Sequence, residues 1–150
     1  MPLANLAAET RGPLKACTPE LGQHGVDAAL QAWERALESP AWDGRAVRVH
    51  ADLLPFNLTV ARGAIHGVID FGTVGVGDPA ADVAAAWTLF DPVGRDAYRD
   101  ALEVDEGTWV RARGYALHQA ANIVWYYRHT HPTFASSAVA TIKRATEDQQ

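Results

Sequence analysis

Three polar side chains, His50, Asp52 and Asn57, stand at fixed spacing in the otherwise apolar segment VHADLLPFNL. Asp70 follows a further apolar run, AIHGVI. Two carboxylates and an amide oxygen are hard ligands of the kind that Mg²⁺ binds, with water and phosphate oxygens in its other positions. The pattern therefore indicates phosphoryl transfer, in which one aspartate accepts the proton of a hydroxyl while the asparagine and the second aspartate hold the metal.

A β-hairpin is the element that brings these residues together. The runs NLTV and AIHGVID are rich in strand-forming residues, and they predict a hairpin from Asn57 to Asp70 whose turn is Arg62 and Gly63. The two ends of a hairpin meet. We therefore expect Asn57 and Asp70 to be neighbours, with Asp52 on the loop beside them. An earlier β-rich run, AVRV, precedes that loop.

Helical patterns occupy most of the remaining chain. Apolar residues recur at helical spacing and predict a helix over 26–39, at Val26, Leu30, Trp33 and Leu37. Residues 1–25 mix glycine, proline and polar residues without a sustained period. We expect them to form a poorly defined lead-in that is irregular or loosely helical.

The second half of the sequence predicts a helical subdomain over 78–147. Two Asp-Pro pairs are typical helix starts, Asp78 with Pro79 and Asp91 with Pro92. Either Asp105 or Thr108 is expected to cap the next helix, and Pro132 to begin the last one. With the catalytic loop and metal-binding hairpin at 46–72, the fold class is mainly α with a small β-hairpin (α+β) in a single domain over 1–150.

The composition limits the classes of function. The chain has 150 residues, 48% of them apolar, which is enough for a real core. A net charge of −5 with scattered basic residues argues against a nucleic-acid partner. The uncharged runs are too short for a membrane span, and no export signal is recognisable. Together with a single cysteine, these features lead us to expect a cytoplasmic protein without membrane association.

Two motifs resemble those of kinases. His50, Asp52 and Asn57 match the H-x-D-x-x-x-x-N catalytic loop, and IDFG supplies Asp70, Phe71 and Gly72 as the metal-binding triplet. The short interval between them, followed by VGDPAADVAAAW, resembles the aminoglycoside phosphotransferase family of small-molecule kinases more than protein kinases. The resemblance runs from about Trp33 to YYRHTHP and implies the C-terminal lobe of a protein-kinase-like fold.

The resemblance implies a role for each matched residue. Asp52 would be the catalytic base, Asn57 and Asp70 the Mg²⁺ ligands, and Asp82 a structural carboxylate that holds the catalytic loop. His50 would support the loop by packing and hydrogen bonding, as would Phe71 and Gly72. Asp78 is expected to be a helix cap.

The resemblance also implies the ligands. The cofactors are Mg²⁺ and ATP or GTP, and the acceptor is a hydroxyl of an aminoglycoside or a similar, cationic small molecule, as in antibiotic resistance. The late helices of this family border the acceptor site. This makes three acidic residues weaker candidates for contacts with a cationic substrate, namely Glu103, Asp105 and Glu106. The aromatic residues Trp109, Trp125, Tyr126 and Tyr127 are expected in the core or in the wall of the groove.

The chain departs from the family pattern in two respects. Family members often have HGDLHPGN, whereas this sequence has Ala51, Leu54 and Phe56. Residues 1–45 also contain no glycine-rich strand-turn-strand, and Lys15 lies in no β-rich run. The N-terminal nucleotide-clamping lobe is thus expected to be absent, giving a truncated form. Such a form would expose an apolar patch near the catalytic loop, and two copies could pair there as a homodimer.

Two other functions remain open at this stage. The first is a non-catalytic remnant of the lobe that binds a small cationic ligand or a protein partner. The second is a metal-dependent hydrolase built on His50, Asp52 and Asp70, in which Asn57 and the IDFG segment would be coincidental.

Overall fold

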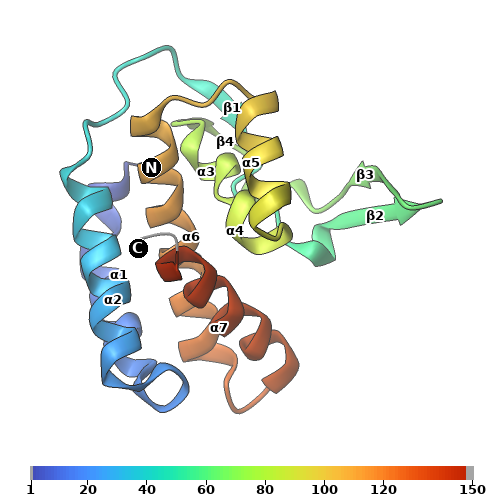
Figure 1. Ribbon diagram of the computed structural model, residues 1–150. Helices are drawn as coiled ribbons and strands as arrows, with labels where there is room; N and C mark the ends of the chain where they lie inside the picture. Colours follow the sequence, from blue (N-terminus) through green and yellow to red (C-terminus); the bar gives the residue numbers. More distant parts are fainter. Residues whose placement is uncertain (1, 148–150) are drawn as a thin grey trace.

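The computed structural model describes residues 2–147 and is mainly helical with a small β component (Figure 1). In chain order its elements are η1 (Leu3–Leu6), α1 (Ala7–Ala16), α2 (Thr18–Glu38), β1 (Val47–Val49), η2 (Pro55–Asn57), β2 (Leu58–Ala61), β3 (Ala64–Val68), η3 (Phe71–Thr73), β4 (Gly75–Gly77), α3 (Ala80–Val83), α4 (Ala85–Leu89), α5 (Pro92–Ala101), α6 (Glu106–Tyr127) and α7 (Pro132–Glu147). The predicted class, mainly α with a small β-hairpin, is confirmed.

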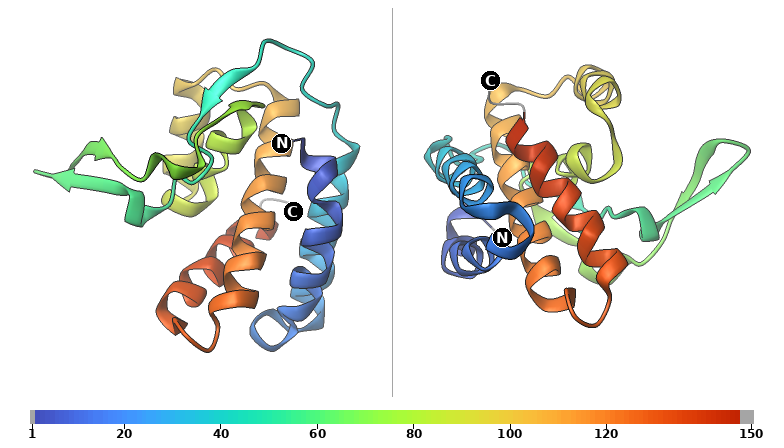
Figure 2. Two further views of the ribbon diagram at one scale, coloured as in Figure 1. Left: turned by 180° about the vertical axis from the view of Figure 1, so that it is seen from behind. Right: turned by 60° about the horizontal axis from the view of Figure 1, so that its bottom comes forward.

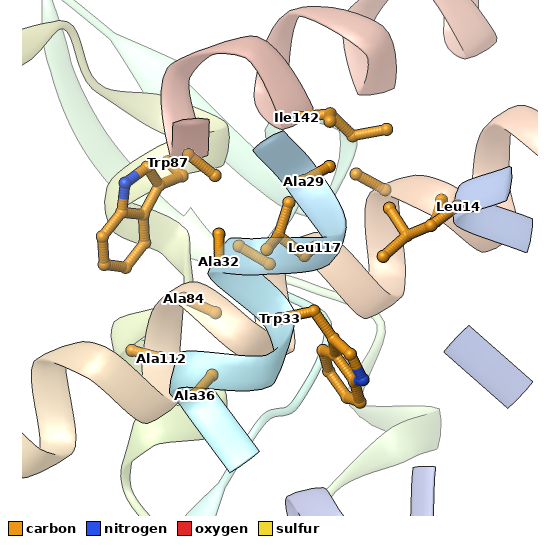
Figure 3. Close-up of a cluster of buried hydrophobic side chains, with 14 of the residues drawn as sticks. Leu14, Ala29, Ala32, Trp33, Ala36, Ala84, Trp87, Ala112, Leu117 and Ile142 are labelled. Atoms are coloured by element: carbon orange, nitrogen blue, oxygen red, sulfur yellow. The ribbon is translucent and has the colours of Figure 1, made fainter. Parts of the chain in front are cut away.

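Helix α6 is the centre of the core, and α1, α2, α3, α4 and α7 all pack against it (Figures 1 and 2). Its buried face consists mostly of small side chains, which let neighbouring helix backbones approach closely: Ala112, Gly114, Ala116, Leu117, Ala120, Ala121 and Val124. Trp33 of α2 and Trp87 of α4 are fully buried and fill the larger spaces around this face (Figure 3). These two rings bury far more apolar surface than the alanines around them.

The first 25 residues differ from the prediction. Within the described part, residues 3–16 form η1 and α1, and α2 begins at Thr18 and not at residue 26. Helix α2 is kinked at Gly22, whose φ is 68°. The prediction of a poorly defined lead-in was wrong because Leu6, Leu14 and Cys17 bury their side chains in the common core, and this tertiary contact outweighs the local glycine and proline signals.

Pro13 lies inside α1, where proline removes the hydrogen bond to the carbonyl of residue 9. A side chain of another helix replaces the missing donor. Asn122 of α6 donates from Nδ2 to the carbonyl oxygen of Glu9 at 3.2 Å. The helix therefore tolerates a proline that sequence patterns alone treat as a break.

Strand β1 pairs antiparallel with β4, with Val47 opposite Gly77 and Val49 opposite Gly75. The sequence analysis did not predict β4, because its segment GTVGVG is rich in glycine and carries no strand pattern. The pairing with β1 supplies the stability that the local sequence lacks. It also ties the segment after Asp70 back to the start of the catalytic loop.

Strands β2 and β3 form the predicted hairpin, which projects from the helical body (Figure 2). Arg62 and Gly63 occupy the turn with φ of 53° and 78°, as a type I′ turn requires. The register changes between Thr59 and Val60, which leaves a β-bulge. Apolar side chains on and beside the hairpin are exposed, including Phe56, Val60, Ile65 and Phe71. The expected apolar patch near the catalytic loop stays a prediction.

Aspartates begin several helices, as predicted. Asp91 accepts a hydrogen bond from the Gly94 amide at 2.8 Å, and Asp105 accepts one from the Thr108 amide at 2.9 Å, which identifies Asp105 as the cap of α6. The last helix begins at Pro132.

Among residues 2–147, no helix has both the length and the apolar character needed to cross a lipid bilayer.

The close packing of α6 against α2 and η1 at Gly114 leads to a prediction about stability. A methyl group added at Gly114 would lie 2.7 Å from the Ala36 Cβ and 2.7 Å from a terminal carbon of Leu3. We expect Gly114→Ala to lower the free energy of unfolding by about 1–3 kcal/mol, measured by chemical denaturation. The double variant Ala36→Gly/Gly114→Ala moves the methyl group from α2 to α6 and should recover most of that loss. Equal stability of Gly114→Ala and the wild type would contradict the contact.

Candidate active site

A carboxylate on helix α3 holds the loop that follows β1. Asp82 accepts a hydrogen bond from the His50 amide at 2.9 Å and a second one from the Ala51 amide at 2.7 Å. Hydrogen bonds to a charged group contribute about 1.5–3 kcal/mol each. The two bonds fix the backbone immediately before Asp52, so the position of the candidate base is set by α3.

Ala51 adopts a left-handed backbone conformation, with φ of 65°. This conformation costs an alanine roughly 1–2 kcal/mol but costs glycine almost nothing. The two hydrogen bonds that Asp82 accepts offset the cost of this backbone conformation. The geometry also gives a physical reason for the glycine that the resembling motif HGDLHPGN carries at this place.

The ring of His50 is buried and has a partner at each nitrogen. Nε2 lies 3.0 Å from the carbonyl oxygen of Ile69, and Nδ1 lies 3.3 Å from the amide of Asp52. A carbonyl only accepts and a backbone amide only donates, so in this arrangement Nε2 donates and Nδ1 accepts. With both nitrogens engaged, His50 is placed to support the loop and to link it to the strand before Asp70.

Both carboxylate oxygens of Asp52 accept hydrogen bonds from side-chain amides. Asn57 donates from Nδ2 to Oδ2 at 2.9 Å and also to the Asp52 carbonyl at 2.8 Å. Gln119 of α6 donates from Nε2 to Oδ1 at 2.6 Å. These contacts fix the carboxylate in one orientation. They leave it lone pairs to accept a further proton, since a carboxylate offers about four acceptor positions.

The hairpin brings Asn57 and Asp70 together as predicted. The Ile69 amide donates to the Asn57 carbonyl at 2.9 Å, so Asp70 is the next residue after this link. Asp70 is exposed and has a left-handed backbone with φ of 59°, a conformation that aspartate tolerates better than most residues. Its Oδ1 accepts a long hydrogen bond from the Gly72 amide at 3.4 Å.

The donor atoms of this pair suit Mg²⁺. Asn57 uses its Nδ2 for both hydrogen bonds to Asp52, which leaves the amide oxygen as its ligand atom, and Asp70 adds a carboxylate. Mg²⁺ binds through one or two carboxylates together with substrate phosphates and water. Among residues 2–147, no group of three or more His, Cys, Asp or Glu side chains is placed to hold a metal by itself. Asn57 and Asp70 could thus supply at most two protein ligands to a bound metal.

Aromatic side chains flank the loop. Phe71 makes an edge contact with the His50 ring, with centroids 4.8 Å apart, although 57% of Phe71 is exposed. Phe56 points outward and meets Phe134 of α7 at 5.3 Å. The bulky residue at position 56 thus packs on α7, and Asn57 keeps its place beside Asp52.

Asp78 forms a buried ion pair as well as a cap. Its Oδ1 accepts from the Ala80 amide at 2.9 Å, and its Oδ2 accepts from Nε of Arg111 at 2.7 Å. Arg111 also donates to the Pro40 carbonyl at 2.9 Å, which anchors the loop between α2 and β1. Removing one partner of a buried pair costs about 3–5 kcal/mol, so this contact holds α3, and with it Asp82, on α6.

The three acidic residues proposed as weak substrate contacts lie elsewhere. Asp105 caps α6, Glu106 pairs with Arg99 at 2.5 Å, and Glu103 lies in the turn between α5 and α6. None of them lines the clefts next to Asp52. The structure therefore offers no geometric basis for their contact with a substrate bound at Asp52.

Asp52 lines two clefts. The larger, about 790 Å³, lies between α6 and the segment from β1 to α3, and its wall includes Asp52, Gly75 and Gln119. The smaller, about 660 Å³, lies beside Asn57 and the start of α7. Both volumes are in the range of small-molecule sites. The candidate base thus stands where two ligands could meet.

The sequence analysis missed Gln119 and Arg111. Gln119 is 67 residues from its partner Asp52, and no motif marks it. A signal for Gln119 did exist, because polar side chains recur at helical spacing in the second half of α6, at Tyr115, His118, Gln119 and Asn122. This polar stripe lies on the cleft side of α6.

The left-handed residue before Asp52 yields a prediction. Because the hydrogen bonds to Asp82 come from the backbone, Ala51→Gly should keep them while removing the strain. We expect the free energy of unfolding to rise by about 0.5–1 kcal/mol in urea denaturation, less than the full strain because glycine also adds entropy to the unfolded chain. Ala51→Val, which adds a β-branched side chain at the same φ, should lower it. Stabilisation by valine would contradict the assigned backbone geometry.

Comparison with known proteins identifies the family of the chain. A model of the phosphotransferase enzyme family (APH) matches residues 2–117, well over half of the chain. No curated protein and no solved structure matches. The matched range includes the catalytic loop, the hairpin with Asp70, and Asp82. The arrangement of a supported aspartate beside an asparagine and a second aspartate thus agrees with the match, and the chain belongs to the phosphotransferase enzyme family.

Proposed function

We propose that this chain transfers a phosphoryl group from Mg²⁺-bound ATP or GTP to a hydroxyl of a small molecule. The observation that carries the proposal is the Asp52 carboxylate, held by Asn57 and Gln119 at the junction of two clefts. Membership of the phosphotransferase enzyme family supports the same class of reaction. The acceptor and the nucleotide base are parts of the proposal on which the family match is silent.

In this proposal Asp52 accepts the proton of the acceptor hydroxyl. The hydroxyl oxygen forms a bond to the terminal phosphorus, and the bond from phosphorus to the leaving nucleoside diphosphate breaks. Asn57 and Gln119 keep the carboxylate aimed at the hydroxyl, because each donates to a different oxygen of Asp52. A general base must stay within hydrogen-bond reach of the proton that it takes, which is what these two contacts secure.

Asn57 and Asp70 would hold the magnesium ion in this proposal. Bound Mg²⁺ supplies neutralisation of the charge on the transferred phosphate. The exposed position of Asp70 suits a ligand that is completed by phosphate oxygens from solution. The hydrolase alternative has less support, because both nitrogens of His50 are engaged and its ring is not free to bind a metal.

Nucleotide binding gives the first functional prediction. We expect calorimetric titration of Mg-ATP to show micromolar affinity, and Asp70→Ala to weaken it at least tenfold, about 1.4 kcal/mol, because a charged ligand of the metal is lost. Asp96→Ala is the matched control, since Asp96 is an exposed aspartate on α5 away from both clefts. Absence of any Mg-ATP binding to the wild type would favour the non-catalytic interpretation.

The role of Asp52 gives the second functional prediction. Asp52→Asn should retain Mg-ATP affinity within about threefold but lower phosphate transfer by about 10²–10⁴-fold, since only the proton acceptor is lost. Transfer would be followed with γ-labelled ATP, both to water and to added hydroxyl compounds. Circular dichroism and the unfolding midpoint control for folding. Transfer at the wild-type rate by Asp52→Asn would refute the assigned role.

A further inference from the structure

The larger of the two clefts beside Asp52 differs in character from what the sequence analysis expected of an acceptor site. We propose that it binds the phosphate acceptor, and that this acceptor is an uncharged hydroxylated molecule with a ring-shaped apolar face, not a polycation. The inference rests on the proposed phosphotransferase function. It goes beyond that function by naming the chemical class of the acceptor.

The position of the metal ligands assigns the two clefts. Asn57 lines the smaller cleft and not the larger one, and Asp70, at the end of the hairpin that begins after Asn57, lines neither. A phosphate donor must contact both metal ligands and therefore approaches from the hairpin side of Asp52. The acceptor hydroxyl must reach the same carboxylate from another direction, since attack and departure at phosphorus are in line. The larger cleft is the space on that other side.

The larger cleft carries few acidic groups, and one of the two is already paired with a cation. Its acidic residues among those described are Asp52 and Asp78. Asp78 is neutralised by Arg111 and caps α3, and Asp52 accepts from two amides. Several ammonium groups would lose their hydration here, which is costly, and would gain at most one carboxylate that is not paired with a cation, that of Asp52. The cleft is therefore poorly suited to a polycation.

The polar groups along α6 are neutral donors and acceptors. Burial lowers the pKa of His118, so its ring is uncharged at neutral pH. Burial, with the nearby Asp78, raises the pKa of Tyr115 to about 12, so its phenol stays protonated. Gln119 and Asn122 add uncharged amides on the same side of the helix. Such groups bind hydroxyls through hydrogen bonds, with no need for charge on the ligand.

Aromatic side chains at the end of α6 supply the apolar part of the wall. Trp125 is 57% exposed and Tyr126 is 68% exposed, although both line the cleft. Tyr127 and Phe134 also line the cleft, with ring centroids 5.2 Å apart. Rings of this kind pack against flat apolar faces of ligands. Together with the neutral polar stripe, they match a ring compound that carries several hydroxyls.

A matched pair of ligands tests the acceptor class. Phenyl glucoside and phenyl glucosaminide share one skeleton, and the second carries an ammonium group in place of one hydroxyl. We expect calorimetry or saturation-transfer NMR to show the glucoside binding at least fivefold more tightly. Kanamycin and choline serve as competitors. Kanamycin is a polycation and would bind if the carboxylates of the cleft dominated recognition. Choline is a quaternary ammonium ion and would bind if the aromatic rings formed a cation-binding site. Neither should displace the glucoside at equal concentration.

Two variants locate the binding. Tyr126→Ala removes an exposed ring and should weaken the glucoside about fivefold without changing the unfolding midpoint. Val93→Ala is the control, since Val93 is 78% exposed on α5 outside the cleft, and it should have no effect. Equal or tighter binding of the glucosaminide, displacement by kanamycin or choline, no glucoside binding, or full affinity in Tyr126→Ala would each overturn the inference.

A Mg-ATP titration of the same sample distinguishes failure of the acceptor class from failure of the proposed phosphotransferase function. Mg-ATP binding without glucoside binding overturns the acceptor class and leaves phosphoryl transfer standing. Failure of both overturns both. If the glucoside binds and also receives label from γ-labelled ATP, the inference and the proposed function are supported together.

Discussion

The candidate site depends on the contact between Asp82 and two consecutive backbone amides. His50 and Ala51 donate to the two oxygens of this carboxylate, and the bonds hold Ala51 in a left-handed conformation that it would not keep by itself. The turn is followed directly by Asp52, which lines both clefts and accepts a hydrogen bond from Gln119 of α6. Loss of this carboxylate would release the turn, and the orientation of Asp52 would be lost with it.

The support for Asp82 comes from the helical core. Helix α3 has only four residues and cannot hold a position alone. Its start is fixed by Asp78, whose carboxylate is paired with Arg111 on α6, and Arg111 also binds the loop at Pro40. The large helical body thus acts as a frame for a short loop. The loop is held at one end by the pairing of β1 with β4, and Gln119 of α6 donates a hydrogen bond to Asp52 on this loop.

The groups that suit a metal and those that suit a neutral ligand lie on two different sides of Asp52. The hairpin side presents Asn57 and the exposed Asp70, which suit a metal and phosphate oxygens. The α6 side presents neutral amides, a neutral histidine and aromatic rings. Among residues 2–147, Asp52 is the one carboxylate that borders both clefts. In our proposal the position of Asn57 and Asp70 assigns the phosphate donor to the hairpin side, and the uncharged polar and aromatic groups of α6 are the reason for placing a neutral acceptor on the other side.

The sequence by itself determined the local features. Asp52 and Asn57 were found by spacing, the hairpin by its strand residues around Arg62 and Gly63, and the helix starts by Asp-Pro pairs and Asp105, because each of these depends on interactions within a few residues. Only the tertiary structure decided the rest: the order of residues 3–25, the strand β4, the contact from Gln119 and the neutral character of the larger cleft. Those features depend on partners far apart in the chain, such as Asn122 with Glu9 or Gln119 with Asp52. No local pattern records such partners, since what stabilises them is burial and hydrogen bonding that exist only after the helices have packed around α6.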